Sequence, residues 1–238
     1  MTDSITLPPV TMEPVAIVRS AFKEKFGIPR QPGLVNSVVS TIEFLPPFSS
    51  PDAVRGLETC SHIWLVFLFS ECVDKGWNPL VRPPRLGGNK KLGVFASRSP
   101  FRPNSIGLSP VRLTAIRIEG QQVYLDVQGA DLLDGTPILD IKPYLPYSDS
   151  LPDARFEVAE KISLLDLPVL FSTQAETACQ AHTSQTLKEQ ISELLRCDPR
   201  PAYKKNDASR VYGIKLHDLD IHWRITDTGI FVDSIAQL

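Results

Sequence analysis

The first 130 residues alternate between short apolar runs and turn-forming residues. Runs rich in β-branched and aromatic residues, each bounded by Gly, Pro, Asn or Asp, are typical of strands. They lie at residues 13–19, 35–45, 62–69, 92–96, 109–118 and 122–128. The continuously apolar IWLVFLF within 62–69 predicts a strand buried on both faces, whereas the alternating VRLTAIRI predicts one solvent face. Residues 50–60 alone favour a helix here, with Ser50 as the N-cap and Pro51 at the first position.

The pattern changes near residue 150. Residues 144–158 hold two prolines and no helical period, which indicates a connection. Residues 173–199 place Leu187, Ile191, Leu194 and Leu195 at helical spacing and predict one helix that ends near Cys197. The remainder alternates, with breaks at Asp218 and at TDTG (226–229), and predicts two or three short antiparallel strands. We therefore expect a mainly β protein with some α, in two units: an antiparallel sheet or barrel over 10–150 and a small α+β unit over 151–238.

Composition adds one local feature. With 238 residues, 42% of them apolar, the chain can bury a real core, and its formal charge of −2 shows no global bias toward nucleic acid. Residues 75–118, however, hold nine of the 25 basic residues and none of the 27 acidic ones. Because salt screens such a field beyond about 8 Å, a polyanion must come close to feel it.

Several common classes of site are disfavoured. The chain has no G-x-G-x-x-G after a strand, no P-loop, no G-x-S-x-G and no H-E-x-x-H. The four cysteines lie far apart without metal-ligand spacing, so we interpret them as reduced thiols. No basic, apolar leader and no window of eighteen apolar residues occurs, so we expect a cytoplasmic protein with no membrane partner.

The stretch GVFASRSPFRPNSIGLS (93–109) holds Arg98 and Arg102 among prolines. Proline limits the entropy lost when a neighbouring side chain is presented to a ligand, and guanidinium groups match carboxylate and phosphate. These arginines can therefore clamp a small anion or an RNA backbone. A solvated loop with surface arginines is the alternative, and charge alone does not separate the two. The preceding LGGNKKLG is either a hairpin tip or a phosphate-contacting loop.

Longer motifs carry more information. They are EKFGIPRQPGLV (24–35), DAVRGLETCSHIWLVF (52–67), RPPRLGGNKKLGVFASRSPFRPNSIGLS (82–109), DLLDGTPILDIKPYLP (131–146) and DPRPAY (198–203). Together they resemble the TsaA-like family of tRNA methyltransferases, strongly over residues 13–147 and more loosely beyond. The resemblance implies a homodimer in which an antiparallel β-barrel, not a Rossmann sheet, binds S-adenosylmethionine close to the subunit interface. It also implies a smaller C-terminal domain.

The implied reaction is methyl transfer from S-adenosylmethionine to N6 of threonylcarbamoyladenosine at position 37 of threonine tRNA. Two other functions stay open. One is a noncatalytic RNA-binding β-barrel module, which calorimetry with the methyl donor would separate. The other is a methyltransferase acting on another small substrate.

The family's donor-site positions can be carried over to this chain. They fall on Pro29, Arg30, Gln31, Ser70, Glu71, Arg98, Leu108, Asp131, Leu132, Leu133 and Asp134. A related enzyme has His-Gln where this chain has Ser70-Glu71, so we expect backbone contacts there. The donor's carboxylate needs a cation, which Arg30 or Arg98 provides, and its ribose needs an acceptor, which Asp131 or Asp134 provides. An ordinary turn at Asp134–Gly135 is the alternative.

The reaction favours a general base, because the N6 lone pair of the threonylcarbamoyl base is delocalised. Asp134 or Asp140 is the candidate for this catalytic role. His62 is interpreted as a core or strand-end residue, since an apolar run follows it. The reaction needs no metal, and we expect none.

The tRNA is expected to be held mainly through its phosphates. The candidates are Arg82, Arg85, Lys90, Lys91, Arg102, Arg200, Tyr203, Lys204 and Lys205. Tyr203 either stacks on a base or packs internally. Arg102 either shapes its own loop or reaches the tRNA.

Overall fold

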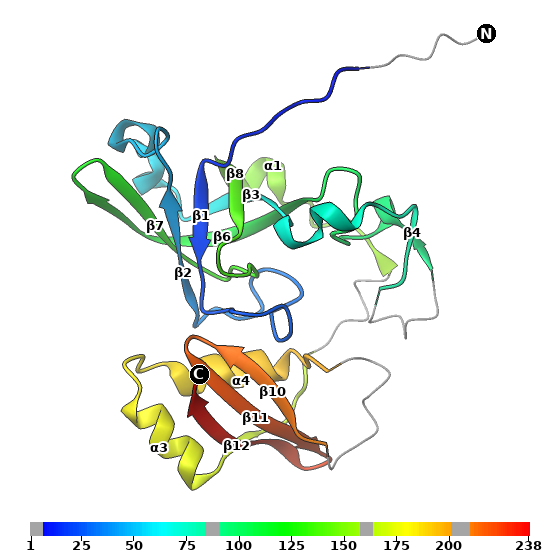
Figure 1. Ribbon diagram of the computed structural model, residues 1–238, viewed down its shortest axis with the longest axis vertical. Coiled ribbons are helices and arrows are strands. Elements are labelled where there is room, and N and C mark those ends of the chain that lie inside the picture. The colour runs from blue at the N-terminus through cyan, green and yellow to red at the C-terminus, as the bar shows by residue number, and fades with distance from the viewer. Residues whose placement is uncertain (1–6, 84–90, 158–163, 201–209) are drawn as a thin grey trace.

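A computed structural model describes residues 7–83, 91–157, 164–200 and 210–238. Six strands close into an antiparallel barrel in the order β1-β2-β7-β6-β3-β8, as Figure 1 shows. The strands are β1 (Ala16–Arg19), β2 (Val39–Phe44), β3 (His62–Leu68), β6 (Ile106–Glu119), β7 (Gln122–Gln128) and β8 (Pro137–Pro143). The expected mainly β, barrel-based fold class is confirmed.

Strand β3 corrects one expectation. Its burial alternates: Ile63, Leu65 and Phe67 point into the barrel and are buried, whereas the residues between them are partly exposed. A barrel strand has an outer face, and here that face carries large apolar residues, so an unbroken apolar run does not mean burial on both sides. Phe67 pairs with Gly107 on β6, where an added Cβ would lie 2.2 Å from the Phe67 ring.

Several element boundaries also differ from expectation. The helix expected at 50–60 is two short 3-10 turns, Pro51–Val54 and Leu57–Thr59, split by Gly56 at φ 98°, and the Ser50 side chain caps neither. The strand expected at 92–96 shrinks to β5 (Leu92–Gly93), which pairs with β4 (Leu80–Val81). The sequence pattern missed β8, whose Pro-flanked segment PILDIKP carries weak strand signals.

The C-terminal part is a four-stranded sheet with two helices. Its strands lie in the order β10 (Tyr212–Leu216), β11 (Leu219–Thr226), β12 (Gly229–Gln237) and β9 (Val169–Phe171), the last pair being parallel. The three antiparallel strands after residue 210 and their turns are confirmed.

The single helix expected over 173–199 is wrong. Two helices occur, α3 (Thr173–Ala181) and α4 (Leu187–Arg196), and the second ends next to Cys197 as expected. The break coincides with local hydrogen bonds that compete with the helix. The Ser184 amide donates to Nδ1 of His182, and the Ser184 and Thr186 hydroxyls pair at 3.2 Å. A further short helix, α1 (Pro146–Asp149), follows the barrel.

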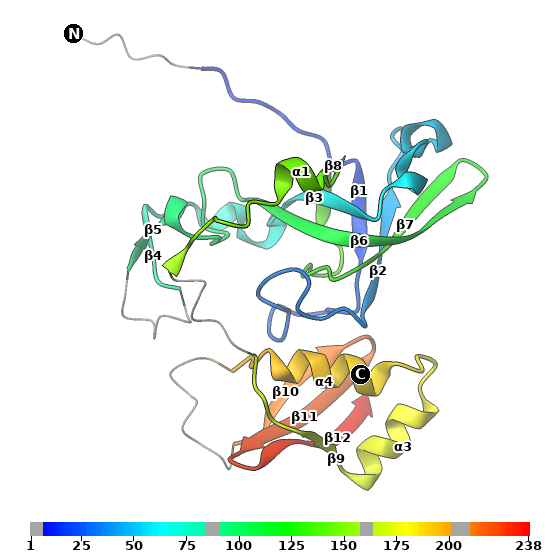
Figure 2. The same cartoon turned by 180° about the vertical axis from the view of Figure 1, so that it is seen from behind.

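The two parts share a core. Ala21, Phe22, Val35 and Val38, which precede β2 in the chain, are buried in the same apolar cluster as α4 and the C-terminal sheet. The His217 amide donates to the Ala21 carbonyl at 2.7 Å. Figure 2 shows α4 on the side of the C-terminal sheet that faces the barrel. Residues 20–38 therefore connect the barrel to α4. In the described ranges, no helix is both long and apolar enough to cross a membrane.

Candidate functional site

Asp131 begins the DLLDG loop between β7 and β8. The hydroxyl of Ser109, a buried residue on β6, donates to Asp131 Oδ1 at 2.7 Å. Burial raises the pKa of Asp131, while the Ser109 hydrogen bond and the nearby charge of Arg98 act in the opposite direction with smaller effect. Asp131 is therefore a carboxyl group that is easier to protonate than an ordinary aspartate.

Arg98 joins two of the predicted donor-site segments. Its Nη1 donates to Gln31 Oε1 at 2.6 Å, which links the 93–109 stretch to Pro29, Arg30 and Gln31, called the PRQ loop below. Gln31, Arg98, Ser109 and Asp131 together are called the Asp131 cluster below. It contains a cation and an amide, which can bind the carboxylate and other polar groups of S-adenosylmethionine, beside a carboxylate that can accept a proton. The residues present thus fit that donor.

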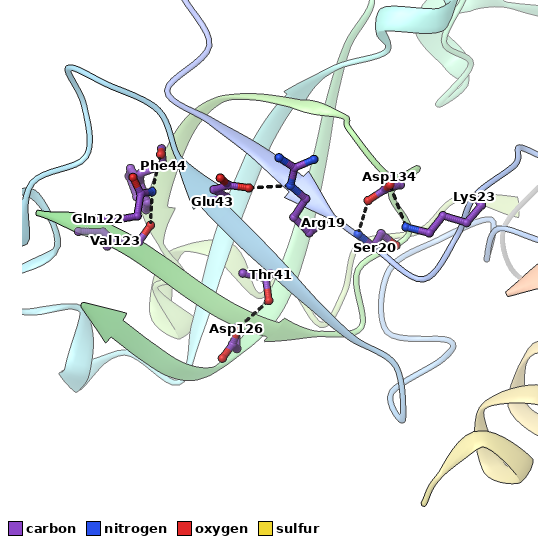
Figure 3. Close-up of polar contacts among 10 residues, drawn as sticks. All are labelled: Arg19, Ser20, Lys23, Thr41, Glu43, Phe44, Gln122, Val123, Asp126 and Asp134. Carbon is purple, nitrogen blue, oxygen red and sulfur yellow. Dashed lines mark hydrogen bonds and ion pairs between the residues drawn. The ribbon is translucent and has the colours of Figure 1, made fainter. Parts of the chain in front are cut away.

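Asp134 lies at the other end of the same loop in a different setting (Figure 3). Its Oδ1 accepts from the Ser20 amide at 2.8 Å and its Oδ2 from Lys23 Nζ at 2.9 Å. Burial alone would raise its pKa, but these two hydrogen bonds and the Lys23 charge lower it. Gly135, at φ 77°, then donates to the Val18 carbonyl. Asp134 thus ties a turn to β1, the alternative considered from the sequence.

The other candidate base, Asp140, lies on β8 with half of its side chain exposed. It pairs with Lys142 two residues on, at 2.9 Å. His62 is the exposed first residue of β3, as expected for a strand-end residue, and its Nδ1 lies 2.9 Å from the Ser61 hydroxyl. Among the described residues, neither Asp140 nor His62 forms a hydrogen bond or ion pair with a residue of the Asp131 cluster.

Arg30 points away from the Asp131 cluster. It lines a cavity of about 180 Å³ together with Lys25 and Cys197, between the barrel loop and the end of α4. Its Nη2 donates to the Arg200 carbonyl at 3.4 Å. Burial lowers the pKa of its guanidinium, against the attraction of Asp198. Of the two cations considered for the donor's carboxylate, Arg98 is the one in the cluster.

The remaining donor-site positions are spread around the same region. Glu71 lies in the first turn of a 3-10 helix, Ser70–Lys75, and pairs with Lys25 at 3.4 Å, so this helix contacts the segment that precedes Pro29. Leu108 is 52% exposed on the outer face of β6. Three positions have backbone or packing roles instead: Pro29 and Leu132 are buried, and the Leu133 carbonyl accepts from the Thr136 amide and hydroxyl.

The predicted tRNA contacts divide into three groups. Arg82 and Lys91 are exposed. Arg102 donates to the Val94 and Ser97 carbonyls at 3.2 and 2.7 Å, so it shapes its own loop. Arg200 is 7% exposed and pairs with the buried Asp198, which corrects its placement on a tRNA-facing surface. The others lie outside the described residues: Arg85, Lys90, Tyr203, Lys204 and Lys205.

Sequence reasoning missed three residues that organise these groups. They are Ser109, Lys23 and Glu193, whose partners lie 22, 111 and 156 to 157 residues away. Motif spacing carries no signal for such contacts, because closure of the barrel and docking of α4 create them. The four cysteines form no disulfide, and the described residues hold no group of three or more His, Cys, Asp or Glu placed to bind a metal.

Comparisons with known proteins identify the family to which this chain is similar. Residues 17–150 match the model of the tRNA-methyltransferase O N-terminal domain, and residues 165–238 match that of the TrmO C-terminal domain. The tRNA (adenine(37)-N6)-methyltransferase of Escherichia coli is 45% identical over 94% of this chain and 96% of its own. RcsF of Pseudomonas aeruginosa, named as an S-adenosylmethionine-dependent methyltransferase, is 48% identical over 90% of this chain and 91% of its own.

Solved structures agree with these sequence matches. A crystal structure of TrmO from Pseudomonas aeruginosa superposes with a TM-score of 0.78 at 39% identity, covering 97% of this chain and all of that one. A second TrmO crystal structure gives a TM-score of 0.75 at 40% identity, over 96% of this chain and all of that one.

Proposed function

The chain belongs to the tRNA-methyltransferase O family, and on that premise we propose that it methylates N6 of threonylcarbamoyladenosine at position 37 of threonine tRNA. Membership in the family establishes the general activity, which is S-adenosylmethionine-dependent methylation of tRNA. We propose in addition that the methylated base carries the threonylcarbamoyl group and that the substrates are the threonine isoacceptors. Because its substrate is tRNA, we expect the protein to act in the cytoplasm.

The Asp131 cluster is the observation that carries the donor site. When bound, S-adenosylmethionine provides the electrophilic methyl group. Arg98 is the cation that would hold the donor's carboxylate, and Gln31 is an amide that can bind its polar groups. The 2.6 Å bond between Arg98 and Gln31 keeps both side chains in place before the donor arrives, which reduces the entropy lost on binding.

Asp131 is our candidate for the group that accepts the N6 proton. A base works best when its pKa lies near the working pH, and burial moves the pKa of Asp131 in that direction. Asp134 is a poorer match, because both its oxygens already accept hydrogen bonds from the barrel and its pKa is lowered. The geometry thus favours Asp131 over the two carboxylates selected from the sequence.

The outer face of the barrel supports the homodimer that we propose. Neighbouring strands β3 and β6 carry Trp64, Val66, Leu68, Ile106 and the 52% exposed Leu108 on this face. The adjoining segment adds Trp77 at 52% exposure and Phe95 at 77%. An apolar surface of this kind marks an interaction site, and Leu108 is also a donor-site position. We therefore expect a second copy to cover this face beside the donor site.

Arg82 and Lys91 are the described side chains that we propose for tRNA phosphate contacts. Both are exposed in the basic segment. Replacing Lys91 by Gln should weaken tRNA binding and reduce the slope of its salt dependence by about one. Binding measured at several salt concentrations would reveal an unchanged slope, which would remove Lys91 from the tRNA surface.

Nucleoside mass spectrometry tests the proposed reaction. Threonine tRNA carrying threonylcarbamoyladenosine is incubated with the enzyme and S-adenosylmethionine bearing a labelled methyl group. We expect the label on that nucleoside, and none on the same tRNA made without the threonylcarbamoyl group. Label on another molecule with the tRNA untouched would favour the small-substrate alternative. Failure to bind the donor in calorimetry would favour the RNA-binding module.

A further inference from the structure

Glu193 joins the C-terminal part to the segment that follows the PRQ loop. This half-buried residue lies on α4, whose apolar residues Leu187, Ile191 and Leu194 pack into the shared core. A single carboxylate oxygen, Oε2, accepts three hydrogen bonds from the barrel unit. They come from the Asn36 amide at 2.8 Å, the Ser37 amide at 3.0 Å and the Ser37 hydroxyl at 2.8 Å.

This contact is built like an anion site. Two successive backbone amides that converge on one oxygen form the kind of concave nest that proteins use to bind anions. Here the chain fills the nest with its own carboxylate, and charge-assisted hydrogen bonds of this type are about twice as strong as neutral ones. Gln190, one helical turn earlier, adds a bond from its Nε2 to the Ser37 carbonyl at 3.2 Å. Helix α4 therefore fixes the backbone at residues 36 and 37.

The held segment in turn positions the donor-site loops. The Asn36 side-chain amide donates to the Gly33 carbonyl at 3.0 Å, and the Gly33 amide donates to the Gly129 carbonyl at 2.9 Å. Gly129, at φ 79°, precedes Asp131 by two residues, and an added Cβ there would lie 3.2 Å from Asn36 Oδ1 and 3.3 Å from Gly33. The two loops therefore touch through their backbones, beside Gln31 and Asp131.

We propose that Glu193 is a positioning residue of the donor site: through Asn36 and Ser37 it holds the PRQ loop against the loop that carries Asp131. The C-terminal part then serves the methyl-donor site of the barrel as well as its own fold. This inference rests on the proposed use of S-adenosylmethionine. It predicts that a change at Glu193, 50 residues after the end of β8, weakens donor binding without touching the donor.

Calorimetric titration of the full-length protein with S-adenosylmethionine tests the proposal, with thermal unfolding recorded for every variant. We expect Glu193→Ala to weaken donor binding about tenfold, the scale of coupling through packed networks. Glu193→Gln keeps an acceptor oxygen without the charge and should lose less affinity. The matched control is Ser172→Ala, which removes the cap of α3 in the same part of the chain and contacts neither loop. It should lower Tm while donor affinity stays within about twofold.

The outcomes separate cleanly. Glu193→Ala with a lowered Tm and wild-type donor affinity would mean a purely structural role and would overturn the proposal, as would an equal loss of affinity in Ser172→Ala. If Glu193→Ala does not fold, Ser37→Ala removes one of the three hydrogen bonds, and an unchanged donor affinity there is the overturning result. A wild-type protein that binds no donor would overturn the proposed function itself. If wild type binds the donor and Glu193→Ala, Glu193→Gln and Ser37→Ala bind it equally well, this inference alone is overturned.

Discussion

Asp131 and Asp134 are two carboxylates at opposite ends of one short loop, and the fold treats them differently. Asp131 is half-buried beside Ser109 and near Arg98, and desolvation raises its pKa. The two carboxylate oxygens of Asp134 accept hydrogen bonds from the Ser20 amide and from Lys23 Nζ, and its pKa is lowered. The sequence motif DLLDG alone does not distinguish the surroundings of these two aspartates. Their partners support our proposal that Asp131 acts in the reaction, and they show that Asp134 holds the loop next to β1.

Replacing Asp131 by Asn is expected to have the largest effect. If its carboxylate accepts the N6 proton, turnover should fall by about 10²- to 10⁴-fold, the usual contribution of a general base. Donor affinity, measured by calorimetry, should stay within a few-fold. Asp140→Asn is the control, because that half-exposed residue pairs with Lys142 and the Ile141 amide, has no contact with the Asp131 cluster among the described residues, and should keep near-wild-type turnover. A loss of donor affinity with turnover preserved would instead make Asp131 a binding residue.

Arg98→Gln should come next in size. Loss of a charge-assisted contact to the donor's carboxylate is expected to weaken S-adenosylmethionine binding by about 10- to 100-fold. Calorimetry measures this directly, and Arg82→Gln serves as a control that alters the same basic segment without reaching the Asp131 cluster. Unchanged donor affinity in Arg98→Gln would mean that Arg98 does not bind the donor's carboxylate. The contrast between the surroundings of Asp131 and Asp134 would then lose one of its supports.

Asp134→Asn should act on stability rather than on chemistry. The partly exposed Lys23 pair and the Ser20 hydrogen bond together predict a loss of about 1 kcal/mol at neutral pH, measured by denaturant unfolding. Since the folded pKa of Asp134 is lowered, this stability is present above the pKa of the unfolded chain and is lost as pH falls through the folded pKa. The gap between wild type and variant should therefore close in acid. A gap that widens in acid contradicts the assignment.

Ser109→Ala is the smallest change and probes the same balance. The Ser109 hydrogen bond holds the pKa of Asp131 down, so its removal should raise that pKa further. A base must be deprotonated, and the acidic limb of the rate profile should consequently move to higher pH. One hydrogen bond of about 1 kcal/mol limits the change in rate above that limb to about fivefold. A shift of the limb to lower pH would contradict the model.

The sequence predicted the barrel strands well where alternation was strong. Residues 122–128 match β7 at both ends, and the turns at Asp218 and TDTG separate the C-terminal strands as expected. It failed where local signals compete. The break between α3 and α4 coincides with a bond from the Ser184 amide to the His182 ring and one between the Ser184 and Thr186 hydroxyls, and β8 begins and ends with proline.

Three members of the Asp131 cluster were predictable from the sequence, but Ser109 and the contacts of the members were not. The family pattern named Gln31, Arg98 and Asp131, and the fold brings these three together. It could not reveal that Arg30 faces the cavity beside Cys197, or that Asp134 is paired with Lys23. Those facts depend on contacts across the closed barrel and across its junction with α4, which no local pattern encodes.

The pH dependence of a single turnover tests the contrast between the two carboxylates most directly. Wild type, Asp131→Asn and Asp134→Asn would each be saturated with S-adenosylmethionine and mixed with threonylcarbamoyl-modified threonine tRNA. We predict that wild type and Asp134→Asn lose rate together as pH falls through the raised pKa of Asp131, while Asp131→Asn is slow and lacks that acidic limb. An acidic limb that persists in Asp131→Asn, or that disappears in Asp134→Asn, would contradict the account.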